Sequence, residues 1–409
     1  MYQIDFNHPS SIYFVGIGGI SMSGLAEILK DAGFRVSGSD RSKSPLTETL
    51  ERKGINVFYG QRAGNITDDI DLVVYTAAIH ESNEEFAAAK NKGIPMMTRA
   101  ALLGQIMANF AKSIAVAGTH GKTTTTSMLT HILLQADTDP TVSVGGMLDR
   151  IGGNIRVGHS DLFLTEACEY TNSFLHFFPK ISVILNIEED HLDFFKDLED
   201  IRHSFHQFAE LLPEDGTLII NAEIKDYAEI YEGLSCNVVT YGTNGCFDYS
   251  AKNITYDENG HVAFDLFRRG EYADHIQLSV TGDHNVSNAL SAIAVADILG
   301  LSIDITKRGL LSFTGTDRRF EYKGEFNGVT VIDDYAHHPT EILATLKAAQ
   351  HSLHNSVWCV FQPHTYTRTK AFFHEFAEAL SHADHLVLAD IFAARETDTL
   401  GISSADLVF

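Results

Sequence analysis

Short apolar runs alternate with helical patterns along the chain, and two early segments show a strand, a loop and a helix in succession. In SIYFVGIGGISMSGLAEIL (residues 11–29), the apolar run from Ile12 to Val15 predicts a buried strand, and the glycines after it predict a tight turn into a helix. In residues 113–134, SIAVAG predicts a second buried strand and TTTTSMLTHILL a second helix.

A third opening of the same kind is VTVIDDYAHHPTEILATLKAA (residues 329–349). Its strand ends at Asp333 and Asp334, and Pro339 suits the first residue of a helix. Repeated strand–loop–helix units predict an α/β fold with parallel sheets. We expect three domains: a Rossmann-like domain over residues 1–110, a central P-loop ATPase-type domain over 111–315, and a Rossmann-like domain over 316–409.

Composition and charge exclude several classes of protein. With 30 basic and 54 acidic residues, the net charge is −24, which argues against a non-specific binder of nucleic acid or of an anionic membrane. The four cysteines are widely spaced without a C-x-x-C pair, and we find neither a signal peptide nor an apolar run long enough to cross a membrane. The expected location is the cytoplasm.

The stretch GTHGKTTT (residues 118–125) predicts a phosphate-binding loop, although Val116 stands where the usual pattern has its first glycine. Gly118 and Gly121 allow close approach of the backbone to a phosphate. Lys122 is expected to reach the β- and γ-phosphates of ATP, and the Thr123 hydroxyl to ligate Mg²⁺. Thr119, His120 and Thr124 complete the expected ATP-binding loop. The alternative, a threonine-rich helix N-terminus that binds nothing, is weakened because strand, glycines, Lys-Thr and helix all fall in order.

Two further predicted strands end in acidic residues. DLFLTEACEY (residues 161–170) and ISVILNIEEDHLDFF (181–195) would bring Glu166 and His191 to the sheet edge where Lys122 and Thr123 lie. Carboxylates suit Mg²⁺, whereas a histidine ligand to Mg²⁺ is unusual, and a solvated turn is the alternative for the EEDH segment.

These segments resemble the Mur ligases, and GTHGKTTT is also similar to the loop of the related folylpolyglutamate synthetases. EACEYTNSF and NIEEDHLD resemble the family's metal-binding segments, which implies that Glu166 and His191 bind magnesium; the resemblance assigns no role to Glu169. Several family members carry a carbamoylated lysine shortly afterwards, but residues 201–216 contain no lysine. In this the chain is similar to the alanine-adding branch, and how a second metal is held stays open.

The resemblance extends to nucleotide contacts in the central and third domains. TGDHNVSNALSAIAVA is similar to the adenine-contact segment and implies a role for Asn288, while GTDRRFE and IDDYAHHPTE imply nucleotide contacts for Arg319 and Asp334. Taken alone, Asn288 is equally a helix cap and Arg319 a surface charge.

The first domain must be weighed against a dehydrogenase. GIGGIS departs from the dinucleotide fingerprint at its third glycine, where Ser21 stands, although Asp40 follows the next strand as a ribose partner would. A separate phosphate loop in the next domain makes a nicotinamide cofactor the poorer interpretation. The resemblance instead implies that Gly16, Gly18 and Gly19 approach a UDP diphosphate and that Asp40 meets the uridine.

In the third domain, FQPHTYTRTK (residues 361–370) supplies His364, Tyr366 and Arg368. The guanidinium fork of Arg368 suits a carboxylate, so Arg368, with Tyr366, is expected to bind the amino acid. With DDYAHHPTE, this segment resembles the alanine-adding branch. The chain ends where family members continue through another α/β unit, so the third domain is expected to be incomplete.

The resemblance implies an ATP- and Mg²⁺-dependent ligase that joins L-alanine to UDP-N-acetylmuramate through an acyl phosphate. His364 and His337 are the candidates for the general base. A related ligase whose acceptor is a peptide, and a catalytically inactive nucleotide sensor, are the alternatives. The sequence leaves open whether the protein is a monomer or a homodimer.

Overall fold

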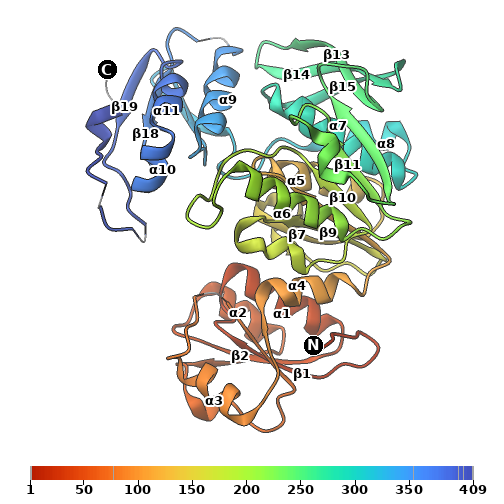
Figure 1. The fold of residues 1–409 in the computed structure, drawn as a ribbon, viewed down its shortest axis with the longest axis vertical. Coiled ribbons are helices and arrows are strands. Elements are labelled where there is room, and N and C mark those ends of the chain that lie inside the picture. The colour runs from red at the N-terminus through yellow and green to blue at the C-terminus, as the bar shows by residue number, and fades with distance from the viewer. Residues whose placement is uncertain (1, 77, 353, 395, 399, 408–409) are drawn as a thin grey trace.

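The computed structural model describes residues 2–407 except 77, 353, 395 and 399. The chain forms three α/β bodies in sequence order, here called the N-terminal domain (β1 to α4), the central domain (β6 to α8) and the C-terminal domain (from β16 onward), as Figure 1 shows. The predicted α/β class with parallel sheets is confirmed.

The N-terminal domain is a five-stranded parallel sheet in the order β3-β2-β1-β4-β5. β1 is buried along its whole length because parallel strands are covered on both faces. The strands are β1 (Ser11–Val15), β2 (Arg35–Asp40), β3 (Asn56–Tyr59), β4 (Leu72–Tyr75) and β5 (Met96–Thr98), and the helices are α1 (Ile20–Asp31), α2 (Pro45–Arg52), α3 (Glu84–Lys92) and α4 (Arg99–Met107).

The central domain is built on a ten-stranded sheet in the order β15-β14-β13-β12-β11-β10-β6-β9-β7-β8. Its middle is parallel, and both ends turn antiparallel. The strands are β6 (Lys112–Ala117), β7 (Thr141–Leu148), β8 (Gly153–Arg156), β9 (Leu162–Ala167), β10 (Ile181–Ile184), β11 (Thr217–Asn221), β12 (Asn237–Gly242), β13 (Tyr249–Tyr256), β14 (His261–Arg268) and β15 (Glu271–Thr281). The helices are α5 (Lys122–Gln135), α6 (Leu198–Glu210), α7 (His284–Ile298) and α8 (Ile303–Ser312).

Helices cover both faces of the central sheet. On one face, apolar residues of α5 and α7 belong to one core with those of the sheet, among them Met128, Val286 and Val116. On the other face, α6 contributes Phe205 and Phe208 to a core that continues into the N-terminal domain. The two domains therefore share one apolar core.

The contact between these two domains also requires a glycine on α4. A Cβ at Gly104 would lie 1.9 Å from the backbone oxygen of His176, which ends the 3₁₀ segment Tyr170–His176. Any side chain at this position would push the N-terminal domain away from the central domain.

In the C-terminal domain, the described strands form two separate pairs instead of one sheet. β16 (Glu321–Phe326) and β17 (Val329–Asp333) are antiparallel, whereas β18 (Trp358–Phe361) and β19 (His385–Leu388) are parallel. The helices are α9 (Pro339–Gln350), α10 (Tyr366–Ala371) and α11 (Phe373–Leu380). α9 begins at Pro339 as predicted, and His338 caps it. Leu346 and Phe376 belong to the small core of this domain.

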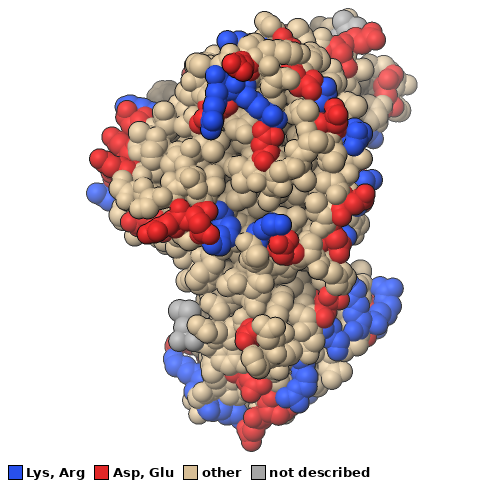
Figure 2. All heavy atoms as spheres, turned by 90° about the vertical axis from the view of Figure 1, so that its right-hand side faces the viewer, with Lys and Arg blue, Asp and Glu red and all other residues tan. Residues whose placement is uncertain are grey.

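The helices and the surface charge bear on whether the chain contacts a membrane or nucleic acid. Across the described residues, no helix is both long and apolar enough to cross a membrane. On the face seen in Figure 2, acidic and basic side chains both occur on the upper and the lower part of the molecule.

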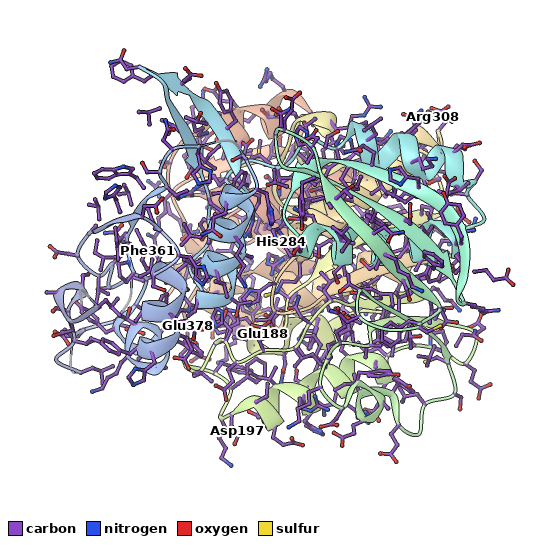
Figure 3. The ribbon with its side chains drawn as sticks, turned by 90° about the horizontal axis from the view of Figure 1, so that it is seen from above. Glu188, Asp197, His284, Arg308, Phe361 and Glu378 are labelled. Atoms are coloured by element: carbon purple, nitrogen blue, oxygen red, sulfur yellow. The ribbon has the colours of Figure 1, made fainter. Side chains whose placement is uncertain are left out.

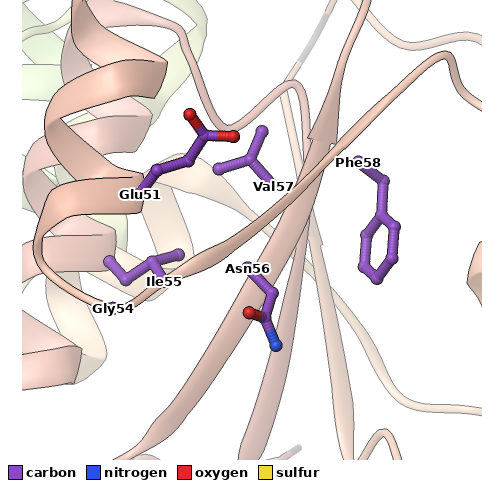
Figure 4. Close-up of a pocket in the computed structure, with 6 residues that line it drawn as sticks. All are labelled: Glu51, Gly54, Ile55, Asn56, Val57 and Phe58. Atoms are coloured by element: carbon purple, nitrogen blue, oxygen red, sulfur yellow. The ribbon is translucent and has the colours of Figure 1, made fainter.

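A shallow pocket lies on the N-terminal domain where α2 leads into β3 (Figure 4). Its lining residues are Glu51, Gly54, Ile55, Asn56, Val57 and Phe58. The pocket contains one titratable side chain and none of the predicted site residues, so it is not the candidate active site.

Candidate active site

The phosphate loop joins β6 to α5 near the middle of the central sheet, where β6 lies between β9 and β10. Val116 is a fully buried residue of β6, so the loop itself begins only at Gly118. Gly118 and Gly121 have φ of 142° and 85°, and a Cβ on either would meet Leu185 or Asn288 at under 3 Å. Both glycines are therefore needed for the shape of the loop.

Two asparagines hold this loop from neighbouring elements. Asn186 accepts a hydrogen bond from the His120 backbone N–H (2.7 Å) and donates one to the His120 carbonyl (3.1 Å). Asn288, buried on α7, lies against Gly121 and donates to Asn285. Asn288 was predicted from a resemblance, whereas Asn186 was missed; its place directly after a buried strand was the available signal.

Lys122 is held at the start of α5 by groups that a phosphate could replace. Its ammonium lies 2.9 Å from Glu169 Oε2, 2.5 Å from the Gly118 carbonyl and 3.1 Å from the Thr119 carbonyl. Burial favours the neutral amine, but the Glu169 carboxylate outweighs it and leaves the pKa of Lys122 raised. The lysine is therefore a buried cation at the mouth of the loop.

Thr123 and Glu166 lie together as expected. The Thr123 hydroxyl donates to Glu166 Oε2 (3.2 Å), and the Gly145 N–H donates to the other carboxylate oxygen (2.5 Å). Burial raises the pKa of Glu166, although both hydrogen bonds and Lys122 oppose the shift. A buried carboxylate beside a hydroxyl and a cationic loop has the donor chemistry of a Mg²⁺ site.

His191 lies near the phosphate loop and is connected to it through Glu169. Its Nε2 lies 3.7 Å from Glu169 Oε1 and 3.8 Å from Asp190 Oδ2, and its ring packs on Tyr170. Burial lowers the pKa of His191, which favours the neutral imidazole that a metal requires. Since Glu169 also contacts Lys122, it links the histidine to the phosphate loop.

The C-terminal domain meets this loop through Glu341 of α9. Glu341 Oε1 lies 3.1 Å from His120 Nδ1 and 3.8 Å from Arg319, and Oε2 accepts from the His337 backbone N–H (3.0 Å). Asp334 fixes the preceding loop by accepting from the N–H groups of Phe320 and Ala336. Arg319 and His337 are thus brought to the edge of the phosphate loop.

The predicted amino-acid-binding segment faces the same boundary. Arg368 donates from Nη2 to Asp190 Oδ1 (2.8 Å), and its Nη1 lies 3.2 Å from His364 Nδ1. The His364 and His337 rings lie 6.2 Å apart. The backbone N–H of Tyr366 donates to Glu396 at the start of α10. His337, His364 and Arg368 therefore form one polar wall opposite Asp190.

The second predicted site lies at the carboxyl ends of β1 and β2. The Gly18 N–H donates to Asp40 Oδ2 (2.9 Å), the Gly16 N–H donates to the Ser39 carbonyl (2.9 Å), and Gly19 caps α1. A Cβ on Gly18 would stand 2.7 Å from both Asp40 and Thr47. The four predicted residues are thus adjacent in space.

A phosphate loop with its lysine, hydroxyl and acidic groups, set between two other α/β domains, is typical of an ATP-using enzyme of several domains. Comparison with known proteins identifies the class. The model described as "Mur ligase family, catalytic domain" matches residues 11–111, "Mur ligase middle domain" matches 116–296, and "Mur ligase, glutamate ligase domain" matches 318–408. The chain belongs to the Mur ligase family.

Individual members of the family show which of its enzymes this chain is similar to. The UDP-N-acetylmuramate–L-alanine ligase of Lachnospira eligens is 62% identical over 408 residues, covering 100% of this chain and 89% of the relative. The solved UDP-N-acetylmuramate–alanine ligase of Thermotoga maritima is 31% identical with a TM-score of 0.77, covering 94% of this chain and 86% of its own. A murein peptide ligase from Psychrobacter arcticus is 28% identical with a TM-score of 0.73, covering 93% and 84%.

Proposed function

We infer that this protein is an ATP-dependent, ADP-forming ligase that joins L-alanine to the carboxylate of UDP-N-acetylmuramate in peptidoglycan synthesis. The observation that carries this conclusion is the 62% identity, along the whole chain, to relatives named as that ligase. The phosphate loop and the polar wall opposite Asp190 support this proposal, because both lie where the central and C-terminal domains meet.

The chemistry starts from a carboxylate, which is a poor electrophile toward an amine. The muramyl carboxylate oxygen attacks the γ-phosphorus of ATP, forming an acyl phosphate and releasing ADP. We assign to Lys122 and the N–H groups of the loop the stabilisation of charge on the transferred phosphoryl group. In this assignment Lys122 exchanges Glu169 for phosphate oxygens.

Mg²⁺, which we assign to Thr123, Glu166 and His191, would neutralise charge on the nucleotide phosphates. The position of Glu166 beside the Thr123 hydroxyl fits this role, as does the lowered pKa of His191, which favours its neutral ring. Asn288, Arg319 and Asp334 are assigned to the nucleotide, and Gly16, Gly18, Gly19 and Asp40 to the UDP of the substrate.

The alanine amine then attacks the acyl carbon, and phosphate leaves with the electrons of the broken C–O bond. We assign Arg368 and Tyr366 to alanine. His364 is the better candidate for the base that takes the ammonium proton. Burial and the neighbouring Arg368 lower its pKa, so its ring is neutral and able to accept a proton. His337, 6.2 Å away, is the second candidate.

Free thiols at all four cysteines fit a reducing compartment, and we place the reaction in the cytoplasm. Because the two substrates bind to different domains in this assignment, the domains must close to bring them together and exclude water from the acyl phosphate.

The experiment that tests this function measures phosphate release from ATP by the full 409-residue chain. One reaction contains both UDP-N-acetylmuramate and L-alanine, and each of two further reactions omits one of them. Release that requires both substrates supports the ligase. Release with a peptide but not with L-alanine would favour the peptide-adding alternative, since the chain is also similar to the murein peptide ligase of Psychrobacter arcticus. ATP binding without amine-dependent release would favour an inactive nucleotide sensor.

A further inference from the structure

Three side chains meet at the boundary between the central and C-terminal domains, beside the proposed magnesium site but separate from it. They are His120 of the phosphate loop, Glu188 of the segment after β10, and His338 at the N-cap of α9. One ligand atom from each lies within 4.8 Å of the other two. Figure 3 shows Glu188 where the C-terminal domain, in blue, meets the central domain.

Two of these atoms lie at a distance that suits an ion pair and also suits two ligands of one metal ion. His120 Nε2 is buried without a hydrogen-bond partner among the described residues, yet Glu188 Oε2 lies only 3.5 Å from it. That distance is long for a hydrogen bond. Two ligands that share a tetrahedral Zn²⁺, each at about 2.0–2.1 Å from the metal, stand roughly 3.3 Å apart. The nitrogen and the oxygen are therefore spaced as ligands of one ion.

The groups around these three residues have the arrangement of an outer ligand shell. Glu341 binds the opposite ring nitrogen of His120 at 3.1 Å, and Thr340 donates to Glu188 Oε2 at 2.7 Å. The His338 ring contacts the Glu189 carbonyl at 3.1 Å through Nε2, while its Nδ1 accepts from the Thr340 N–H at 3.4 Å. Glu341 holds Nδ1 of His120 and so leaves Nε2 facing Glu188, as a carboxylate bound to a ligating histidine does in known zinc sites. In His338, the Glu189 carbonyl requires the proton on Nε2, so Nδ1 is the ligand atom, and zinc would replace its long 3.4 Å contact with the Thr340 N–H.

We propose that His120, Glu188 and His338 form a zinc-binding site that fastens the phosphate loop to the N-terminus of α9. Two imidazoles and one carboxylate suit Zn²⁺ and do not suit Mg²⁺, which prefers oxygen ligands. Three protein ligands leave a fourth position for water. Because the ligands come from two domains, bound zinc would stabilise the contact between the central and C-terminal domains that this structure shows.

The test must separate this site from His191, which zinc could also bind. We would use metal-stripped, tag-free protein carrying His191→Ala and titrate it with Co²⁺ as a coloured substitute for zinc. The expected result is one Co²⁺ per chain with the strong visible absorption of a four-coordinate site, displaced by Zn²⁺. Zinc should also raise the thermal midpoint of this variant.

Adding His338→Gln to this His191→Ala background should weaken metal binding by about 10- to 100-fold. It should also abolish the rise in thermal midpoint that zinc causes. His374→Gln, on the exposed face of α11, is the matched control and should change neither. Glu188→Gln retains an acceptor for Thr340 and gives a second disrupting variant if His338→Gln disturbs the packing of α9.

Two outcomes overturn the proposal. In the first, His191→Ala alone abolishes binding, so the metal occupies only the proposed magnesium site. In the second, the His338→Gln and Glu188→Gln variants bind Co²⁺ as tightly as the background. Co²⁺ binding and the thermal midpoint are both measured without ligase activity.

Discussion

The guanidinium of Arg368 is held by the carboxylate of Asp190, 178 positions away in the chain and in another domain. Nη2 and Nε of Arg368 lie 2.8 and 3.3 Å from the same oxygen, Asp190 Oδ1, and both side chains are largely buried. Burial raises the pKa of Asp190, but Arg368 and His191 outweigh it and hold the value at about 2. The residue assigned to the alanine carboxylate is thus already bound to a carboxylate of the protein itself.

Arg368→Lys keeps the charge but loses the fork that holds a carboxylate through two bonds. We expect it to raise KM for L-alanine on the order of 100-fold, because hydrogen bonds to charged groups contribute about 1.5–3 kcal/mol each. KM for ATP should change by less than about threefold. Initial-rate kinetics with each substrate varied would measure the split, and Lys370→Ala, exposed on the same helix, is the control. Equal effects on both KM values would make Arg368 a purely structural residue.

Lys122→Ala removes the ammonium that lies on the loop carbonyls and on Glu169. We expect kcat to fall by about 1,000-fold, since a buried cation on a transferred phosphoryl group is a large part of transition-state stabilisation. Circular dichroism should show a retained fold, although Glu169 is left without its cation. Lys180→Ala, an exposed lysine paired with Asp215, should keep full activity. Near-normal turnover by Lys122→Ala would contradict the assigned loop.

The sequence predicted those parts of the site that are local. Lys122 and Thr123 follow a short loop after their strand, and Glu166 lies near the end of another, so the shared direction of parallel strands was enough to predict that they lie together. Glu341 with His120, and Asp190 with Arg368, could not be predicted, because each pair joins different domains across long stretches of chain. The antiparallel pairing of β17 with β16 was also missed, since an apolar run does not reveal its partner.

Glu166→Gln keeps the shape of the side chain and loses the charge that would face the metal. We expect the Mg²⁺ concentration for half-maximal rate to rise by about 10-fold or more, because a carboxylate ligand becomes a neutral amide. A magnesium titration of initial rate at saturating ATP measures this. Glu210→Gln, a partly exposed glutamate at the end of α6, should leave the titration unchanged. An unchanged titration for Glu166→Gln would remove Glu166 from the ligand set.

Gly18→Ala tests the assignment of the N-terminal domain. The new Cβ would lie 2.7 Å from Asp40 Oδ2 and from Thr47 Cγ2, so the turn or Asp40 must shift. We expect binding of UDP-N-acetylmuramate to weaken by about 10-fold or more, in line with the 1–3 kcal/mol cost of overpacking. ATP binding should be unchanged, and both are measurable by calorimetry. Gly64→Ala, where a Cβ meets nothing within 4 Å, is the control in the same domain. Unchanged binding by Gly18→Ala would separate this turn from the UDP site.

His120 makes the contact between the central and C-terminal domains sensitive to pH in metal-free protein. Its ring lies between Glu188 and Glu341, with the neutral His338 ring beside it and Arg319 on the far side of Glu341. Burial alone would lower the pKa of His120, but the two carboxylates raise it to about 9, while burial and His120 itself lower that of His338 to about 4. A raised folded-state pKa means that the stabilisation is fully present below about pH 6.5, the value for an unfolded histidine, and is lost as pH rises through about 9.

We therefore expect His120→Gln to lower the thermal midpoint at pH 6.5, and the difference from the unmutated chain to disappear by about pH 10. Thermal scans in the presence of a chelator exclude any contribution from bound metal. A difference that stays constant from pH 6.5 to 10 would show that His120 acts through packing and not through its charge.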